Sequence, residues 1–263
     1  MGDELNLEPD FHGQADGLIW RRITIKLLYG AAALALLAVA TLHAAPQASH
    51  VAHKAPPTKA AISVSDPVKT YGTKGAPITL ELFTDYECPI CRSFYENTLR
   101  SLINDYVAAG KVYIIHHDYP LSMHPYSGQA ARWADAAATV GEFGSAEGAL
   151  YDNQDKWAAN GNIAPFIAQA MPRSDFEKVA AIMKDCTTPA PQVTMSNVDP
   201  LAKSGRSCPV DPYIAKDIEA GYKDNVNATP TYIVYHNGQK IAQGSSYVSW
   251  PIFRQFLDSI LSQ

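Results

Sequence analysis

A cysteine motif where a strand meets a helix most constrains the fold of this chain. The motif Cys88-Pro89-Ile90-Cys91 follows the largely apolar run Pro77–Asp85, which predicts a buried strand. Helical periodicity extends over Cys88–Ala109, and Lys111–Asp118 predicts a second strand. Strand, helix and strand with short joins form a βαβ unit, in which the two strands are parallel and the crossover is right-handed. An α/β protein with both cysteines at a helix start is expected.

Several further elements follow this βαβ unit. The alanine-rich stretch His124–Ala181 predicts consecutive helices. Asn237-Gly238 is the strongest short signal for a β-hairpin. The remaining predicted elements are a helix at Asp211–Tyr222, the two hairpin strands at Thr231–Tyr235 and Gln239–Gln243, and a closing helix at Trp250–Leu261.

The spacing of the first two cysteines favours redox chemistry. The unpaired N–H groups of a helix start favour a thiolate at Cys88, and Pro89 fits the first helical turn, where a missing N–H costs nothing. A structural disulfide is a weaker interpretation, because very short loops gain the least from closure. A zinc site would need a second close cysteine pair, but Cys186 and Cys208 stand far apart in the sequence. We therefore expect a redox-active pair and no metal.

A proline at a strand entry is a second candidate for the site. Pro230 follows Thr229 and directly precedes the first hairpin strand. Such a proline is a candidate for a cis peptide bond, although an ordinary trans proline at a strand edge is favoured by the local sequence alone.

Four segments, in order, resemble the DsbA-like family of thioredoxin-fold proteins. They are Leu82–Cys91, Asp118–Leu121 with His124-Pro125, the alanine-rich helix after them, and Ala228–Thr231. The resemblance implies a thioredoxin fold with a helical insertion at about 121–224. It also implies that Cys88 is the exposed nucleophile, that Cys91 is its buried partner, and that Pro230 is a cis-proline facing them, with Pro89, Ile90 and Thr229 supporting the site.

The chain departs from this family at two places. Many members carry an acid where Leu82 stands, whereas Glu81 should point to the opposite face of the strand. The dipeptide Pro89-Ile90 also lacks the histidine of the most oxidising members, so it offers no ring cation to the Cys88 thiolate. The cysteine pair should remain oxidising, but less so.

The other two cysteines bound a polar, proline-rich segment. In an oxidising compartment Cys186 and Cys208 can close a structural disulfide worth ~3 kcal/mol in the chain-entropy account. The alternative is a second redox pair that relays electrons to the first.

An uncharged run near the N-terminus predicts a membrane span. Leu27–Leu42 would extend over ~24 Å as a helix, and lengthening it to residues 23–45 matches a bilayer core of ~30 Å. Arg21, Arg22 and Lys26 precede the run, so the positive-inside rule places the N-terminus in the cytoplasm. A cleaved signal segment is the alternative.

These signals divide the 263 residues into four parts. They are a cytoplasmic tail at 1–22, a transmembrane anchor or signal segment at 23–45, a flexible linker at 46–64 and a DsbA-like thioredoxin domain at 65–263. The predicted location is the inner membrane, with a single pass and a periplasmic or otherwise extracytoplasmic catalytic domain.

The expected function is that of a thiol:disulfide oxidase that donates the Cys88–Cys91 disulfide to reduced exported proteins. The resemblance implies reoxidation by a membrane quinone-linked oxidase. No cofactor is expected, and a net charge of −5 without a basic run argues against nucleic-acid binding. The alternatives are a reductase or isomerase fed with electrons, and a Cu(I) metallochaperone that holds the ion between thiolates.

Overall fold

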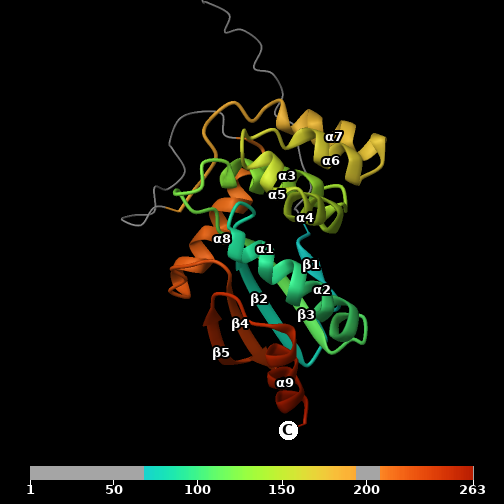
Figure 1. Ribbon diagram of the computed structural model, residues 1–263, viewed down its shortest axis with the longest axis vertical. Coiled ribbons are helices and arrows are strands. Elements are labelled where there is room, and N and C mark those ends of the chain that lie inside the picture. Colours follow the sequence, from blue (N-terminus) through green and yellow to red (C-terminus); the bar gives the residue numbers. More distant parts are fainter. Residues whose placement is uncertain (1–67, 194–207, 263) are drawn as a thin grey trace, which may run out of the picture. The chain divides into compact units, whose positions relative to one another are not determined.

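The computed structural model describes residues 68–193 and 208–262 (Figure 1). The predicted tail, membrane segment and linker at 1–22, 23–45 and 46–64 lie outside these residues. Within the described part of the chain, no helix has both the length and the apolar character needed to cross a bilayer.

A five-stranded mixed sheet forms the centre of the domain, with the strand order β1-β3-β2-β4-β5. The central strand β2 (Ile78–Thr84) pairs in parallel with β3 (Val112–Asp118), as the βαβ prediction requires. On its other side β2 pairs antiparallel with β4 (Thr231–His236), which forms the predicted hairpin with β5 (Gln239–Ser245). The short strand β1 (Thr70–Tyr71) pairs antiparallel with β3.

Helices cover both faces of this sheet. The helix that begins at the cysteine motif runs through α1 (Pro89–Phe94), a π-helical turn and α2 (Arg100–Leu102) to a second π-helical turn ending at Val107. It shares one hydrophobic core with α9 (Trp250–Leu261) and with the side chains of alternate β2 residues. The helix α8 (Asp211–Lys223) packs in a second cluster around Phe83, which points to the opposite face of β2.

In the described residues, five helices between β3 and α8 form the insertion, at the top of Figure 1. Every residue of the first of them except Gln129 is buried, because small alanine side chains let its neighbours approach from several sides. The predicted interval 121–224 contains these five helices and also α8, which contacts β3. The five are α3 (Ser127–Ala138), α4 (Phe143–Asp152), α5 (Gln154–Trp157), α6 (Ala164–Ala170) and α7 (Arg173–Met183).

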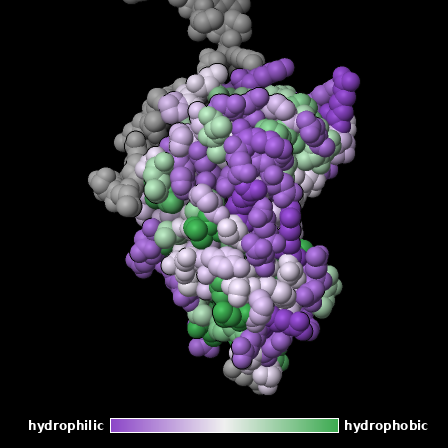
Figure 2. Space-filling view, viewed as in Figure 1, coloured by the Kyte–Doolittle hydropathy of each residue, from purple (hydrophilic) through white to green (hydrophobic). Residues whose placement is uncertain are grey.

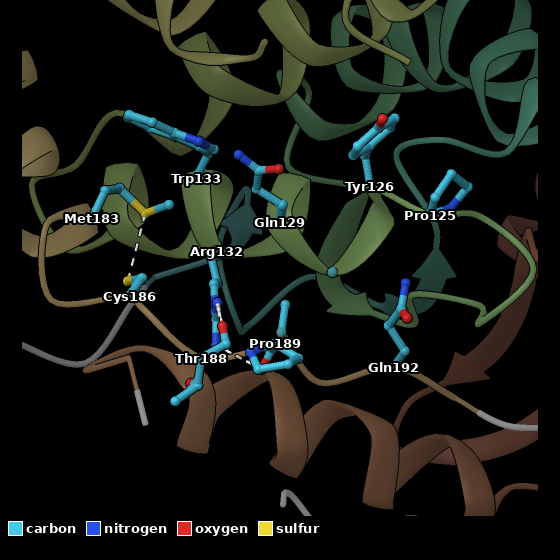
Figure 3. A pocket seen from close by; sticks show the side chains of 12 residues that line it. Pro125, Tyr126, Gln129, Arg132, Trp133, Met183, Cys186, Thr188, Pro189 and Gln192 are labelled. Atoms are coloured by element: carbon cyan, nitrogen blue, oxygen red, sulfur yellow. Dashed lines mark hydrogen bonds between the residues drawn. The ribbon is translucent and has the colours of Figure 1, made fainter. Parts of the chain in front are cut away.

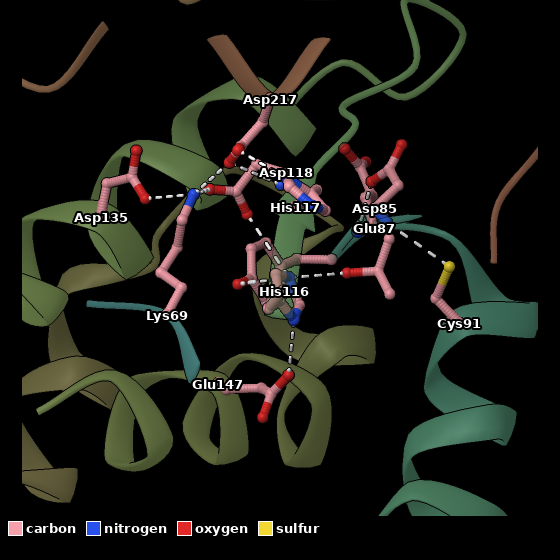
Figure 4. A network of polar contacts seen from close by, with 12 residues as sticks. Lys69, Asp85, Glu87, Cys91, His116, His117, Asp118, Asp135, Glu147 and Asp217 are labelled. Atoms are coloured by element: carbon pink, nitrogen blue, oxygen red, sulfur yellow. Dashed lines mark hydrogen bonds and ion pairs between the residues drawn. The ribbon is translucent and has the colours of Figure 1, made fainter. Parts of the chain in front are cut away.

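A buried ionic cluster joins the insertion to the sheet (Figure 4). The Lys69 Nζ lies 2.5 Å from a carboxylate oxygen of Asp118, 2.6 Å from one of Asp135 and 2.5 Å from one of Asp217. These carboxylates come from the end of β3, from α3 and from α8. One ammonium group therefore holds the chain just before β1 against three other elements.

The predicted α/β class and thioredoxin-like sheet are confirmed, and local details differ. The strand β1 was missed because two residues are too few to show a period. The helix predicted from the periodicity of Cys88–Ala109 contains two π-helical turns. The spacing of apolar residues does not distinguish such short π-helical turns from α-helix. Asn237 and Gly238 both have positive φ, at 49° and 83°, as a two-residue hairpin turn of type I′ requires.

Candidate functional site

The cysteine motif lies where β2 gives way to α1. Cys88 is the N-cap residue of α1, with extended backbone angles, and its N–H donates to the Asp85 carbonyl at 3.1 Å. From α5, the side-chain amide of Gln154 donates to the carbonyl oxygens of Tyr86 at 2.6 Å and of Cys88 at 3.1 Å. Both ends of the short active-site loop are thus held by hydrogen bonds.

The loop before β4 faces this helix start. The Thr229–Pro230 peptide bond is cis, and the Cys88 Sγ lies 3.5 Å from the Thr229 carbonyl oxygen. The structure therefore brings together Cys88, Thr229 and Pro230, which are about 140 positions apart in the sequence.

The two thiols of the motif are free and differ in accessibility. Cys88 keeps 6% of its surface exposed and Cys91 keeps 1%, so Cys88 is the more accessible sulfur although it is less exposed than the resemblance implies. Ile90, between them, is 43% exposed. A substrate thiol approaching from solvent reaches Cys88 first.

The two thiols also differ in acidity. A hydrogen bond from the Cys91 thiol outweighs partial burial and lowers the pKa of Cys88 from about 9 to about 6, helped by the N–H groups at the helix start. Burial raises the pKa of Cys91 well above its ordinary value, and the neighbouring Cys88 adds to this effect. At neutral pH the reduced site is a thiolate at Cys88 beside a thiol at Cys91.

No acid stands at the β2 position beneath the motif. Leu82 is fully buried in the same core cluster as both cysteines. Glu81 points to the other face, where its carboxylate accepts from the Tyr235 hydroxyl at 3.4 Å. The predicted departure from the family pattern is therefore present in the structure.

Strand β3 carries a buried histidine, His116 (Figure 4). His116 is the register partner of Leu82 in the neighbouring strand β2. The His116 Nε2 lies 2.9 Å from the Thr84 hydroxyl, and its Nδ1 lies 3.1 Å from the Glu147 carboxylate of α4. Burial would lower the pKa of His116, but Asp118 and Glu147 outweigh it and raise that pKa to about 9. His117, the next residue, turns to the other face and pairs with Asp217 at 2.9 Å.

Two acidic residues of the active-site loop hold the loop that follows β3. The Asp85 carboxylate accepts from the backbone N–H of Leu121 at 2.8 Å and lies 2.7 Å from the His124 Nδ1. The Glu87 carboxylate accepts from the backbone N–H of Tyr126 at 2.6 Å, and burial raises its pKa. The active-site loop before α1 and the loop after β3 are thus joined by hydrogen bonds beside the cysteine motif.

The other two cysteines lie on the insertion. The structure joins Cys186, after α7, to Cys208, before α8, in a disulfide. A cavity of about 510 Å³ opens beside Cys186, and neither cysteine of the motif lines it (Figure 3). The side chains that line it include Tyr126, Gln129, Arg132, Trp133, Met183 and Gln192.

Apolar surface gathers over β5 and α9 (Figure 2). Ile241 and Ile252 are 43% and 63% exposed there. A groove of about 260 Å³ lies between the two elements, and Tyr232, two residues after the cis-proline, is among its lining residues.

The sheet order, the unlike thiols at a helix start and the facing cis-proline define a thioredoxin-fold thiol–disulfide oxidoreductase. Comparison with known families agrees, because the profile described as thioredoxin matches residues 65–253. The chain belongs to the thioredoxin family, with the architecture of its DsbA-like members.

Solved structures share this fold at low sequence identity. The alpha-DsbA1 of Wolbachia pipientis is 18% identical, with a TM-score of 0.53 over 74% of this chain and 90% of that one. DsbA2 of Pseudomonas aeruginosa is 20% identical, with a TM-score of 0.51 over 76% and 97%. Oxidised BdbD of Bacillus subtilis is 17% identical, with a TM-score of 0.50 over 76% and 98%.

A curated relative matches only a segment of the chain. The Na(+)/H(+) antiporter NhaA 3 of Salinispora tropica is 35% identical over 85 residues, which are 32% of this chain and 13% of that protein. The match therefore spans about an eighth of the relative and transfers no activity.

Three supporting residues of the site were not predicted from the sequence: Asp85, His124 and Gln154. Asp85 and His124 belong to the segments that carry the family resemblance, and their positions after two predicted parallel strands could have placed them at one edge of the sheet. Gln154 comes from the insertion, and nothing in its local sequence indicates the contact.

Proposed function

We propose that this protein is a thiol:disulfide oxidase that works outside the cytoplasm and passes the Cys88–Cys91 disulfide to exported proteins with reduced cysteines. The observation that carries the proposal is the unlike acidity of the two thiols. A disulfide oxidises others readily when one of its two reduced sulfurs is a stabilised thiolate, because that thiolate favours the reduced product.

The oxidised site would react in two exchange steps. A substrate thiolate attacks the sulfur of Cys88, the Cys88–Cys91 bond breaks, and Cys91 leaves as a thiolate that takes up a proton. The second substrate thiolate then attacks the substrate sulfur of the mixed disulfide, and Cys88 leaves as a thiolate. The substrate loses two electrons and forms its disulfide, while the protein gains two electrons and holds the reduced cysteines.

Each step has a structural counterpart. Attack at Cys88 fits its greater accessibility and its place beside the exposed Ile90. The raised pKa of Cys91 fits a leaving thiolate that is protonated quickly and does not reattack. The Thr229 carbonyl beside Cys88 offers a backbone acceptor to an extended substrate strand, as in strand addition to a sheet edge.

The proposal includes a location and partners. The charge pattern around residues 23–45 supports a single-pass anchor in the inner membrane with the catalytic domain outside the cytoplasm. Reduced exported proteins are the proposed substrates, and a membrane quinone-linked oxidase is the proposed source of oxidising equivalents. A cysteine pair that ends each cycle reduced requires such a partner.

The direction of electron flow is tested by the redox state of the site in living cells. Rapid acid quenching followed by thiol alkylation separates the oxidised and reduced forms by mass. We expect the Cys88–Cys91 pair to be mostly oxidised. A pair found mostly reduced would instead support a reductase or isomerase.

The anchor is tested separately. With the proposed anchor, the full-length protein should stay in the membrane fraction through carbonate washing, because Leu27–Leu42 is an apolar run without charge. A purified mature protein whose N-terminus lies between Ala44 and Ser49 would show cleavage and overturn the anchor.

A further inference from the structure

A histidine outside the cysteine motif lies at the wall of the site. His124 belongs to the loop between β3 and α3, and its Nδ1 is 2.7 Å from a carboxylate oxygen of Asp85. The His124 side chain is 18% exposed, whereas that of Asp85 is fully buried. A buried carboxylate thus fixes the orientation of a ring that still touches solvent.

Asp85 connects this ring to both cysteines, through the backbone N–H of Cys88 and the sulfur of Cys91. Its carbonyl oxygen accepts from the Cys88 N–H at 3.1 Å, and its own N–H donates to the Cys91 Sγ at 3.5 Å. Its second carboxylate oxygen accepts from the Glu87 N–H at 2.8 Å, so the Asp85 side chain cannot rotate away from His124 without losing a hydrogen bond within the active-site loop. The ring of His124 therefore has a fixed place relative to the helix start.

The groups around the ring favour its charged form. Among the described residues, the titratable groups that act on His124 are Asp85, Glu87 and Cys88. The hydrogen bond with Asp85 is the main cause that raises the pKa of His124, against partial burial, and the negative charge of Cys88 raises it further. Such coupling is reciprocal, so the ring must stabilise the Cys88 thiolate by the same free energy.

We infer that His124, oriented by Asp85, supplies the cationic ring that the Pro89-Ile90 dipeptide lacks and stabilises the thiolate that Cys88 becomes on reduction. His124 acts through charge and position and makes no bond to the substrate. The inference rests on the proposed function, since a stabilised Cys88 thiolate is what makes the disulfide oxidising. The hydrogen bonds at the helix start remain the larger influence on Cys88.

The first test removes the charge and keeps a hydrogen-bond donor. In His124→Gln the pKa of Cys88, followed by thiolate absorbance, should rise by roughly half a unit to one unit, the Coulomb effect of one charge across a partly hydrated gap. The disulfide should become correspondingly less oxidising against glutathione. His117→Gln is the matched control, because it removes a histidine paired with Asp217 on the opposite face of the sheet and should leave the pKa of Cys88 unchanged.

A second test needs no variant. The neutral disulfide of the oxidised protein has no thiolate, so the pKa of the His124 ring, measured by NMR, should be higher in the reduced protein than in the oxidised one. An equal His124 pKa in both forms, or a His124→Gln protein with lower stability and an unchanged Cys88 pKa, would reduce His124 to a structural link between two loops. Both readouts are independent of the direction of electron flow in cells, so failure of the oxidase proposal would be seen separately.

Discussion

The two cysteine pairs of this domain consist of the same side chains, but their surroundings in the fold differ. Cys88 and Cys91 are free thiols at a helix start, where one sulfur is held by hydrogen bonds and the other is buried. Cys186 and Cys208 are joined in a disulfide between the ends of two helices, 22 positions apart. The first pair has a polarised environment that favours exchange, whereas the second closes a loop. Reactivity therefore follows from the position of a cysteine in the fold.

The most direct test of this difference between the two cysteine pairs removes single sulfurs of the motif. Cys88→Ser should reduce thiol–disulfide exchange to the uncatalysed rate, because the accessible thiolate is lost. Cys91→Ser should accumulate mixed disulfides with substrates, visible on non-reducing gels, because Cys88 can still exchange into a substrate disulfide and Cys91 is no longer there to displace the substrate. Accumulation in the Cys88 variant instead would reverse the two roles.

Removing the second pair should change stability and leave exchange intact. The double variant Cys186→Ser with Cys208→Ser should lose roughly 2–4 kcal/mol of unfolding free energy, because the closed loop restrains the unfolded chain. Denaturant titration measures the loss, and the exchange rate of the same variant is the control. Unchanged stability with slow turnover would favour the electron relay.

The pH dependence of alkylation distinguishes the two thiols of the motif. With a pKa of about 6, Cys88 should react with iodoacetamide at pH 5 about tenfold more slowly than at its plateau above pH 7. The lowered pKa also gives the reduced protein stability that is fully present above about pH 9 and is lost as the pH falls through about 6. Cys91 should stay unmodified over this range, and comparable labelling of both thiols would contradict the assigned asymmetry.

The smallest expected effect concerns the contact between the insertion and the active-site loop. Gln154→Leu leaves the buried carbonyl oxygens of Tyr86 and Cys88 without their donor and should cost roughly 1–2 kcal/mol of unfolding free energy. Gln243→Leu is the matched control, because it removes an exposed amide that donates to the Asp224 carbonyl. Equal losses in the two variants would show that Gln154 does not brace the loop.

Local signals in the sequence predicted the elements that depend on neighbouring residues. The strand before Cys88, the helix start at Pro89 and the turn at Asn237-Gly238 each follow from a few adjacent residues. Adjacent strand residues point to opposite faces of a sheet, and the side chains of His116 and His117 accordingly contact different partners, Glu147 and Asp217.

Contacts between distant segments could not be predicted in this way. Lys69 meets carboxylates 49 and 148 positions away, and His124 meets an acid 39 positions away. The sequence shows these charged residues, but it does not show which of them become buried next to one another in the folded protein. The packing of the insertion against the sheet decides the partners, and a periodicity read along one chain carries no information about that packing.

Folding changes the pKa values of the carboxyl groups that surround Lys69. Burial, with Asp118 and Asp217 close by, raises the pKa of Asp135 well above its ordinary value despite the nearby ammonium. The Lys69 ammonium outweighs burial at the other two carboxyls and lowers the pKa values of Asp118 and Asp217. Folding therefore raises the proton affinity of Asp135 and lowers that of Asp118 and Asp217. The stability that Asp135 contributes is fully present below about pH 4 and is lost as the pH rises through its folded pKa. The stability from Asp118 and Asp217 depends on pH in the opposite sense, because it is lost as the pH falls through their lowered folded pKa values. The junction between the insertion and the sheet is consequently weakened at both extremes of pH.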